Sequence, residues 1–307
     1  MTRKIAIIGA GNVGGITALR LLENRLGEIV LVDVALNLAQ AKALDLEDAR
    51  YALGSNYQIT ATDDFSRISG SAIVIITAGL ARKPGMKREE LLAKNAQILR
   101  AVAADVKKNA SDAIRIVVTN PVDVMTYLCI KELNADRRRV FGMGINLDTS
   151  RFANLISKKI NQDVLNIKAA VLGAHGEGML PLSRLAQVGN RPLDSLISDN
   201  ELKQIEKEVV LRGAQIVHLY GSGSAYFAPS AAILQMVKAV LNDTDEICGA
   251  SILLEGEYGI SGACLGIPVK LGKAGIKEII KLDLTKEELS ALQKSAEAVK
   301  ALCMTLQ

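Results

Sequence analysis

Short runs of apolar residues recur through the first 145 positions and alternate with segments of helical periodicity. We predict strands over residues 4–8, 28–33, 57–61, 72–77, 114–119 and 139–141. Most of these runs are rich in β-branched residues, as expected for strands that are covered on both faces. The segments 39–50 and 89–107 repeat apolar residues at the spacing of amphipathic helices. This alternation predicts an α/β fold with a doubly wound parallel sheet, as in a Rossmann domain.

The pattern changes after residue 145. The predicted elements there are helices over 146–160, 198–220 and 231–241, followed by strand-like pieces over 247–254, 263–265 and 269–271. Gly and Pro separate these pieces, which favours a mostly antiparallel sheet. Thr285 and Glu288 have the spacing of a capping box that opens a last helix. We therefore predict an α+β substrate and catalytic domain over 146–307, packed on a nucleotide-binding domain over 1–145, with the site at their junction.

A glycine-rich turn follows the first predicted strand and opens a helix. Its sequence is Gly9-Ala-Gly11-Asn12-Val13-Gly14, which has the G-x-G-x-x-G spacing. In this context the first glycine permits the turn, the second lets the backbone approach a pyrophosphate, and the third lets helix pack on strand. We assign the five numbered residues of this motif, all but the alanine, to dinucleotide binding.

An acidic residue ends the second predicted strand. Asp33 lies 19 residues after Gly14, where a carboxylate accepts hydrogen bonds from the adenosine ribose hydroxyls. It would repel a 2′-phosphate, and no Arg occurs among residues 34–36 to bind one. The sequence therefore predicts NAD over NADP. The alternative is a strand-end acid with only a capping role.

Four cations, Arg82, Lys83, Lys87 and Arg88, surround a Pro-Gly pair in the loop after the strand at 72–77. Pro and Gly together indicate a turn, so the cations lie on a loop at the carboxyl end of a buried strand. A loop of this kind is either a solvated charged segment or a lid that closes over an anion. The predicted ligand crevice lies at this same edge of the sheet, together with Ala78, Gly79 and Asn120.

One of the two histidines has the position of a functional side chain. His175 lies in a glycine-rich segment that follows an apolar strand pattern over 167–173. His218 lies inside a helical pattern and is predicted to be structural. The alternative for His175 is a core or capping histidine. Asp148 and Arg151 are three residues apart at the start of a helix, where an ordinary surface ion pair is the alternative to a functional one.

Composition excludes several classes of protein. The net charge of +4 is spread along the chain, aromatic residues make up 3% and Trp is absent, so neither a nucleic-acid nor a membrane partner is predicted. Four widely spaced cysteines indicate buried thiols instead of a disulfide framework or a metal site. With no signal peptide and no apolar run of about 18 residues, we expect a cytoplasmic protein without a bound metal.

Taken together, the motifs resemble the lactate/malate dehydrogenase family over essentially the whole chain. They are G-A-G-N-V-G at 9–14, A-G-L-A-R-K-P-G-M-K-R at 78–88, V-T-N-P-V-D at 118–123, N-L-D-T-S-R-F at 146–152, G-A-H-G-E-G-M-L-P-L at 173–182 and S-A-Y-F-A-P at 224–229. The resemblance is greatest to the branch of the family that acts on malate.

This resemblance implies a role for each polar residue. His175 would exchange a proton with the substrate hydroxyl, and Asp148 would orient its imidazole. Arg151 would bind the C1 carboxylate and Arg88 would polarise the reacting carbonyl. Arg82 would bind the second carboxylate of malate or oxaloacetate, whereas relatives that act on lactate commonly have an uncharged Gln there.

The resemblance also assigns further contacts and leaves some choices open. Asn120 would contact both nicotinamide and substrate, and the remaining cofactor contacts would be Thr77, Ala78, Gly79, Asn95 and Val118. The family's usual His-Gly-Asp is His175-Gly-Glu177 here, and Gly178 stands where malate enzymes often have Thr. The alternatives are a lactate or other 2-hydroxyacid dehydrogenase, or a non-catalytic NAD(H)-binding regulator. A homodimer or homotetramer is expected, and the sequence does not distinguish them.

Overall fold

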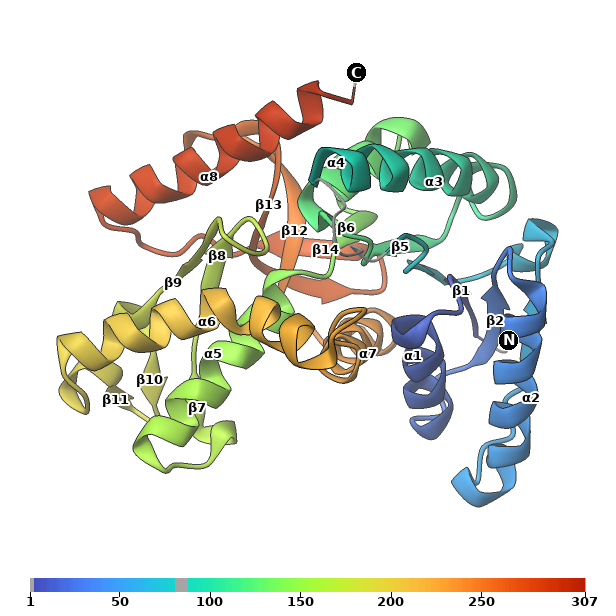
Figure 1. Cartoon of the computed structure of the whole chain (residues 1–307), viewed down its shortest axis with the longest axis horizontal. Helices are drawn as coiled ribbons and strands as arrows, with labels where there is room; N and C mark the ends of the chain where they lie inside the picture. The colour runs from blue at the N-terminus through green and yellow to red at the C-terminus, as the bar shows by residue number, and fades with distance from the viewer. Residues whose placement is uncertain (1–2, 81–87, 307) are drawn as a thin grey trace.

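Parallel strands form the first half of the central sheet in the computed structural model, which describes residues 3–80 and 88–306 (Figure 1). In spatial order they are β3 (Ile59–Thr62), β2 (Glu28–Val32), β1 (Lys4–Ile8), β4 (Ile73–Ile76), β5 (Ile114–Val117) and β6 (Val140–Gly142). Every neighbouring pair in this series is parallel. Their side chains are largely buried, which agrees with strands covered on both faces.

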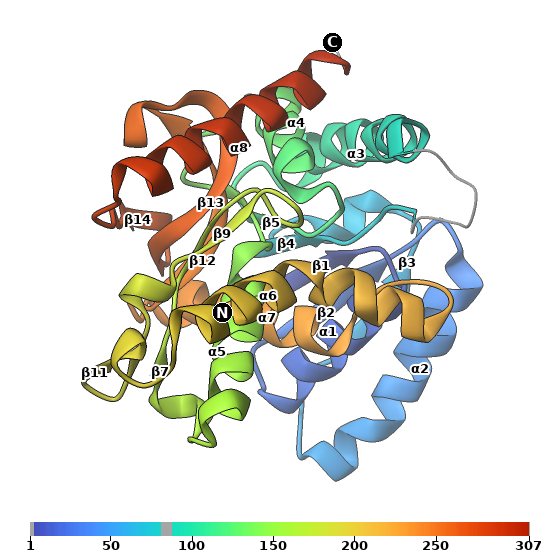
Figure 2. The same cartoon turned by 60° about the vertical axis from the view of Figure 1, so that its left-hand side comes forward.

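Helices cover both faces of this half of the sheet. They are α1 (Asn12–Glu23), α2 (Leu36–Leu53), α3 (Arg88–Asn109) and α4 (Val122–Leu133), with a short 3-10 helix at Phe65–Ile68. Figure 2 shows α1 and α2 on one side of the strands and α3 and α4 on the other. The predicted doubly wound Rossmann sheet is therefore confirmed.

The sheet continues without interruption into the second half of the chain. β12 (Ile247–Glu255) pairs antiparallel with β6 through Ser251 and Gly142. The order continues through β13 (Ser261–Gly272), β8 (Val171–Gly173) and β9 (Met179–Pro181), with β14 (Gly275–Ile279) also on β13. A separate small sheet joins β11 (Arg191–Pro192), β10 (Gln187–Val188) and β7 (Ile167–Lys168).

The helices of the second half are α5 (Ile145–Ile160), α6 (Asp199–Tyr220), α7 (Phe227–Asn242) and α8 (Lys286–Met304). Short 3-10 turns occur at Val164–Asn166, Ser183–Leu185, Leu193–Ser195 and Glu257–Gly259. The predicted capping box opens α8, because Thr285 and Glu288 each accept a hydrogen bond from the other's main-chain N–H. Helix α7 packs on α1, where Arg20 donates to the Ser230 hydroxyl at 2.8 Å (Figure 1).

Three sequence predictions of element boundaries were wrong, and some strands of the second half were not predicted. The pieces predicted at 263–265 and 269–271 are one strand, β13, which runs through Pro268. Strands β9, β10, β11 and β14 were not predicted. The predicted strand before His175 is two strands in different sheets, β7 and β8. Helix α7 begins at Phe227 with Pro229 in its first turn, where a missing N–H costs no helical hydrogen bond.

The apolar pattern over 39–50 predicted a buried side at Ala41, Leu44 and Ala49, and this prediction was wrong for Ala41 and Leu44. Leu44 is 62% exposed and Ala41 is exposed, whereas the buried residues of α2 are Ala39 and Ala43. Small alanines are buried where α2 meets the sheet, Leu46 and Leu53 pack partly buried against the core, and Leu44 is left on the surface.

One hydrophobic core extends through both halves of the chain, and a second cluster lies beneath α5 and α6. All four cysteines are buried with free thiols, as predicted. Across residues 3–80 and 88–306, no helix has both the length and the apolarity needed to cross a membrane.

Candidate active site

The motif between β1 and α1 requires glycine at its first and last glycine positions, Gly9 and Gly14. Gly9 has a φ of +108°, and a Cβ there would lie 2.7 Å from the main-chain nitrogen of Ala78. A Cβ on Gly14 would lie 1.9 Å from the carbonyl oxygen of Gly9. Nothing lies within 4 Å of the Cβ position of Gly11. The turn is therefore packed where helix meets strand and open where a ligand backbone would approach, with the α1 N–H groups beginning at Asn12.

Asp33 is held against this turn at the end of β2. Its Oδ2 accepts the Ala10 N–H at 2.6 Å and its Oδ1 accepts the Ala35 N–H at 2.9 Å. Lys42 of α2, which the sequence analysis did not include, donates from Nζ to the carbonyl oxygen of Gly11 at 2.9 Å. Burial lowers the pKa of Lys42, and the Asp33 charge partly offsets this effect. Lys42 is far from the motif in sequence, so no local pattern marks it.

The ends of β4 and β5 lie beside the glycine turn. The Thr77 hydroxyl donates to the Gly9 carbonyl at 2.9 Å, and Ala78 and Gly79 follow it at the strand end. Val118 donates its N–H to the carbonyl oxygen of Ile76 and is buried. The structure thus gathers the predicted cofactor residues of three strand ends along one edge.

Asn95 and Asn120 differ in exposure. Asn95 of α3 is 1% exposed, and its side chain bonds the main chain of Leu80 on one side and the carbonyl of Asn120 on the other, at 2.8 Å each. It therefore braces the two loops at this edge from behind. Asn120 is exposed, and its Oδ1 accepts the Val122 N–H at 3.3 Å. The Asn120–Pro121 peptide bond is cis.

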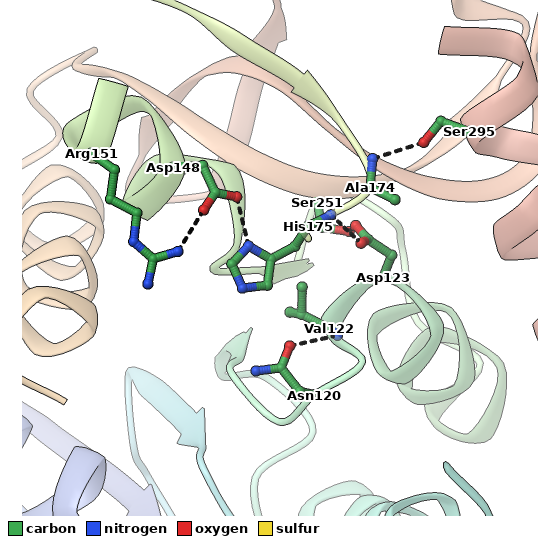
Figure 3. Close-up of polar contacts among 9 residues, drawn as sticks. All are labelled: Asn120, Val122, Asp123, Asp148, Arg151, Ala174, His175, Ser251 and Ser295. Atoms are coloured by element: carbon green, nitrogen blue, oxygen red, sulfur yellow. Dashed lines mark hydrogen bonds and ion pairs between the residues drawn. The ribbon is translucent and has the colours of Figure 1, made fainter. Parts of the chain in front are cut away.

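His175, Asp148 and Arg151 form a connected cluster (Figure 3). The Nδ1 of His175 lies 2.6 Å from Oδ2 of Asp148, and Nη1 of Arg151 donates to Oδ1 of Asp148 at 3.0 Å. Asp148 is completely buried. His175 comes from the loop after β8, and the other two come from the first turns of α5. In the close-up, the imidazole lies between the Asp148 carboxylate and the loop that carries Asn120.

This environment favours the protonated form of His175. Burial alone would lower its pKa, but the charge and hydrogen bond of Asp148 and the charge of Asp123 outweigh burial and raise the pKa above its usual value. Arg151 acts in the opposite direction. A proton shared with Asp148 at Nδ1 leaves Nε2 as the atom that exchanges a proton with a ligand.

Arg151 has an unused donor inside the site. Its side chain is 11% exposed, and within the described chain its Nε is buried without a hydrogen-bond partner. Buried donors are normally paired, so this nitrogen marks a place for an acceptor such as a carboxylate.

Asp123, Ser251 and Ser295 support the His175 loop, and none of them was predicted from the sequence to be functional. Asp123 accepts the His175 N–H at 2.8 Å, and the Ser251 hydroxyl donates to Asp123 at 2.6 Å. The Ser295 hydroxyl accepts the Ala174 N–H at 3.0 Å and donates to the Gly178 carbonyl at 2.9 Å. The only sequence signal was Asp123 itself, the last residue of the quoted V-T-N-P-V-D segment.

The unusual Gly178 is explained by what surrounds it. A Cβ at this position would lie 2.9 Å from the Ser295 hydroxyl and 3.1 Å from the Ala174 Cβ. The hydroxyl cannot move away without losing its two hydrogen bonds, so Ala174 and Ser295 together leave room only for glycine.

Two predicted site residues are not placed by the structure. Arg82 lies outside the described residues. Arg88 is the first residue of α3, but its side chain is outside the described part. His218, predicted to be structural, is exposed on α6.

A glycine turn with an acid at the next strand end, together with a His–Asp pair whose carboxylate is buried, defines a dinucleotide-dependent enzyme. Family models support a more specific statement. The NAD-binding domain of lactate/malate dehydrogenase matches residues 3–142, and the alpha/beta C-terminal domain of the same family matches residues 145–305. The chain belongs to the lactate/malate dehydrogenase family of oxidoreductases, which confirms the resemblance and the prediction of NAD as the cofactor.

Individual relatives come from both branches of the family. The malate dehydrogenase of Methanosarcina barkeri is 43% identical over 297 residues, which is 97% of each chain. The crystal structure of Cryptosporidium parvum malate dehydrogenase superposes with a TM-score of 0.97 at 34% identity, covering 100% of this chain and 99% of that one. Lactate dehydrogenase of the same organism, in complex with lactic acid and NAD, gives a TM-score of 0.97 at 36% identity, with 100% and 98% coverage. The fold therefore does not distinguish the two substrates.

Proposed function

We propose that this protein is an NAD-dependent malate dehydrogenase that interconverts (S)-malate and oxaloacetate. The observation that carries the proposal is the His175–Asp148–Arg151 cluster at the edge of the sheet where the glycine turn and Asp33 lie. The name and the 43% identity of the Methanosarcina relative also support it.

His175 is the proposed proton donor and acceptor. With Nδ1 engaged by Asp148, Nε2 gives a proton to the carbonyl oxygen of oxaloacetate during reduction and takes it from the malate hydroxyl during oxidation. Asp148 fixes the ring orientation and stabilises the imidazolium. When bound, NAD supplies the hydride chemistry, and the protein supplies position and electrostatics.

The arginines are proposed to bind and polarise the dicarboxylate. Arg151 binds the C1 carboxylate with donors that include its unpartnered Nε, a bidentate geometry that Lys could not provide. Arg88 stabilises the charge that develops on the reacting oxygen, and Arg82 binds the distal carboxylate. For Arg82 and Arg88 the support is the sequence motif alone.

The geometry of the glycine turn and of Asp33 supports the cofactor residues that we propose. Gly9, Gly11 and Gly14 make the open turn, and Asp33 stands where the ribose hydroxyls would donate. Asn12, Val13, Thr77, Ala78, Gly79, Val118 and Asn120 would line the remaining contact, with Asn95 bracing it. We add Lys42, whose ammonium group beside Gly11 would attract a pyrophosphate.

A lactate dehydrogenase is the second candidate, because the Cryptosporidium lactate enzyme superposes as closely as the malate enzyme. Among the proposed substrate-binding residues, Arg82 is the one expected to distinguish the two substrates. With pyruvate in the site, Arg82 would be desolvated without a partner, which costs several kcal/mol. Discrimination of about a thousandfold in favour of oxaloacetate is therefore physically available.

Steady-state oxidation of NADH with oxaloacetate and with pyruvate tests the proposal. We expect a higher kcat/KM for oxaloacetate, and a shift of the ratio towards pyruvate in Arg82→Gln. A higher value for pyruvate in the wild type would refute the malate assignment. His175→Asn should lower turnover roughly 100-fold, as expected for loss of a general acid–base. An unaffected His175→Asn variant would instead favour a non-catalytic NAD(H)-binding regulator.

We also propose the organisation of the protein around this function. The boundary between nucleotide and substrate halves is placed at residues 145–146, the protein is cytoplasmic, and its subunits form a homodimer or homotetramer. Exposed apolar side chains on α2, including Leu44 and Tyr51, support a subunit contact there.

A further inference from the structure

A second buried carboxylate lies behind His175. Asp123, near the start of α4, is 4% exposed and binds the main chain of His175, whereas Asp148 binds its ring. Figure 3 shows the two carboxylates on opposite sides of the histidine. The Ser251 hydroxyl from β12 holds the other oxygen of Asp123. Three separate segments of the chain therefore converge on this group.

Hydrogen bonding alone does not explain a carboxylate at position 123. An Asn side chain could accept the His175 N–H through its oxygen and donate its NH₂ to the Ser251 oxygen. It would do so without the cost of burying a charge. Within the part of the chain that the structure describes, no Lys or Arg forms an ion pair with Asp123. The negative charge of Asp123 must therefore have an effect beyond these two hydrogen bonds.

His175 is the group that benefits from this charge. Burial raises the pKa of Asp123 to about 6, and Ser251 and His175 limit the rise, so the carboxylate is ionised at and above neutral pH. Asp148 is the other charged group that faces it. Burial keeps the Cys264 thiol of β13 and the Cys303 thiol of α8 neutral, because it raises both pKa values, that of Cys303 to about 11.

We propose that Asp123, held by Ser251, is a positioning residue that fixes the backbone of His175 and favours the protonated imidazole needed for oxoacid reduction. The proposal rests on the proposed dehydrogenase function, because it concerns His175 as the proton donor. Asp123 acts through His175, since its oxygens are already engaged by the His175 N–H and the Ser251 hydroxyl.

The variant Asp123→Asn tests this role through the pH dependence of kcat/KM for oxaloacetate. The limb that reports protonated His175 should move to lower pH. The variant should lie within about twofold of wild type near pH 6 and fall roughly three- to tenfold below it above pH 8, as expected for loss of one nearby charge. A uniform loss at every pH with an unchanged apparent pKa would indicate a structural role and overturn the proposal.

A titration that needs no substrate separates this proposal from the proposed function. The chain has two histidines, so the imidazole signals of His175 and His218 can be followed by NMR in ¹³C-histidine-labelled enzyme. The variant His218→Gln removes the signal of the exposed His218 and thereby assigns the remaining signal to His175. We expect a lower His175 pKa in Asp123→Asn than in wild type, and an equal or higher value overturns the proposal. Failure of the wild type to reduce oxaloacetate would refute the proposed function without affecting this result.

Ser251→Ala gives a second variant that keeps the carboxylate. Loss of its hydrogen bond should raise the pKa of Asp123, so the kcat/KM profile near neutral pH should shift in the same direction as in Asp123→Asn. In the Asp123→Asn background Ser251→Ala should cause no further shift, and an additive shift would contradict the proposal. Ser295→Ala is the matched control, because it removes a hydrogen bond from the same loop but no charge. It should alter kcat without moving the apparent pKa.

Discussion

Asp123 weakens the folded state at the pH where it serves His175. Its carboxyl pKa is about 6 in the folded chain, against 3.8 for an ordinary aspartate, because burial disfavours the charged form. Below about pH 4 the group is largely protonated in both folded and unfolded states, so its ionisation no longer affects stability. As the pH rises from about 4 to about 6, the unfolded state ionises first, so the stability that this group contributes falls through that window.

Asp123→Asn should therefore stabilise the protein at alkaline pH while impairing catalysis. We expect the free energy of unfolding at pH 8 to rise by about 1–3 kcal/mol, and the gain to fade below pH 5. Urea unfolding at both pH values and equal protein concentration measures this difference. A variant that is less stable than wild type at pH 8 would show that Asp123 contributes to folding through more than its charge. The expected result is a trade-off of stability for activity at one residue.

At the scale of elements, α5 is the helix that carries Asp148 and Arg151, and its first residue fixes its distance from the sheet. A Cβ at Gly266 of β13 would lie 2.3 Å from Cγ2 of Ile145, and a Cβ at Gly249 of β12 would lie 2.9 Å from Cδ1 of Ile145. These glycines make room for a large side chain. The next residue, Asn146, accepts the Gly249 N–H and donates to the Gln235 side chain of α7.

Gly266→Ala should push α5 away from the sheet. We expect a loss of about 1–3 kcal/mol in stability, as for overpacking of a core, and a lower kcat/KM because Asp148 moves with the helix. Ile145→Ala in the same chain should restore part of both losses, although the Gly173 carbonyl still lies 2.9 Å from the new Cβ. A double-mutant cycle on unfolding free energy measures this coupling. Strictly additive losses would show that Ile145 does not set the helix position.

The sequence predicted the elements whose signals are local and missed the contacts that depend on packing. β-Branched runs, the glycine spacing and the acid Asp33 at a strand end indicated the sheet edge at which the proposed cofactor residues lie, because each signal lies within a few residues. Asp123, Ser251 and Ser295 come from α4, β12 and α8, and no spacing in the chain links them. Pro268 suggested a break in the strand. In the structure, Pro268 of β13 pairs with Gly249 of β12, and the Pro268 carbonyl accepts the Ile280 N–H, so β13 continues through the proline.

For the whole molecule, the exposed apolar side chains of α2 favour a subunit contact. Tyr51 is 97% exposed and Leu44 is 62% exposed, and Leu38 of the same helix is 45% exposed. Single exposed apolar residues occur on the surface of most proteins, so exposure alone does not identify a subunit contact. A change in oligomeric mass on mutation of these residues would identify one.

Leu44→Glu should shift the protein towards smaller species, because a buried charge in a subunit contact is costly. Light scattering at micromolar concentration gives the mass of each form. Leu165→Glu is the matched control, since Leu165 is 88% exposed on the 3-10 turn at 164–166, away from α2. Equal masses for wild type and both variants would place the subunit contact elsewhere.

The pairing of β6 with β12 has a consequence for hybrid enzymes that join the first half of this chain to the second half of a relative. Ser251 pairs with Gly142 across this junction and also holds Asp123, which lies before the proposed boundary, whereas His175 lies after it. A hybrid that joins residues 1–145 of this chain to the second half of a relative would combine Asp123 with a foreign partner at position 251. We expect such a hybrid to keep the fold but to differ from its parents in the pH dependence of activity. The pH dependence should be kept only if the residues at positions 123, 175 and 251 all come from the same parent.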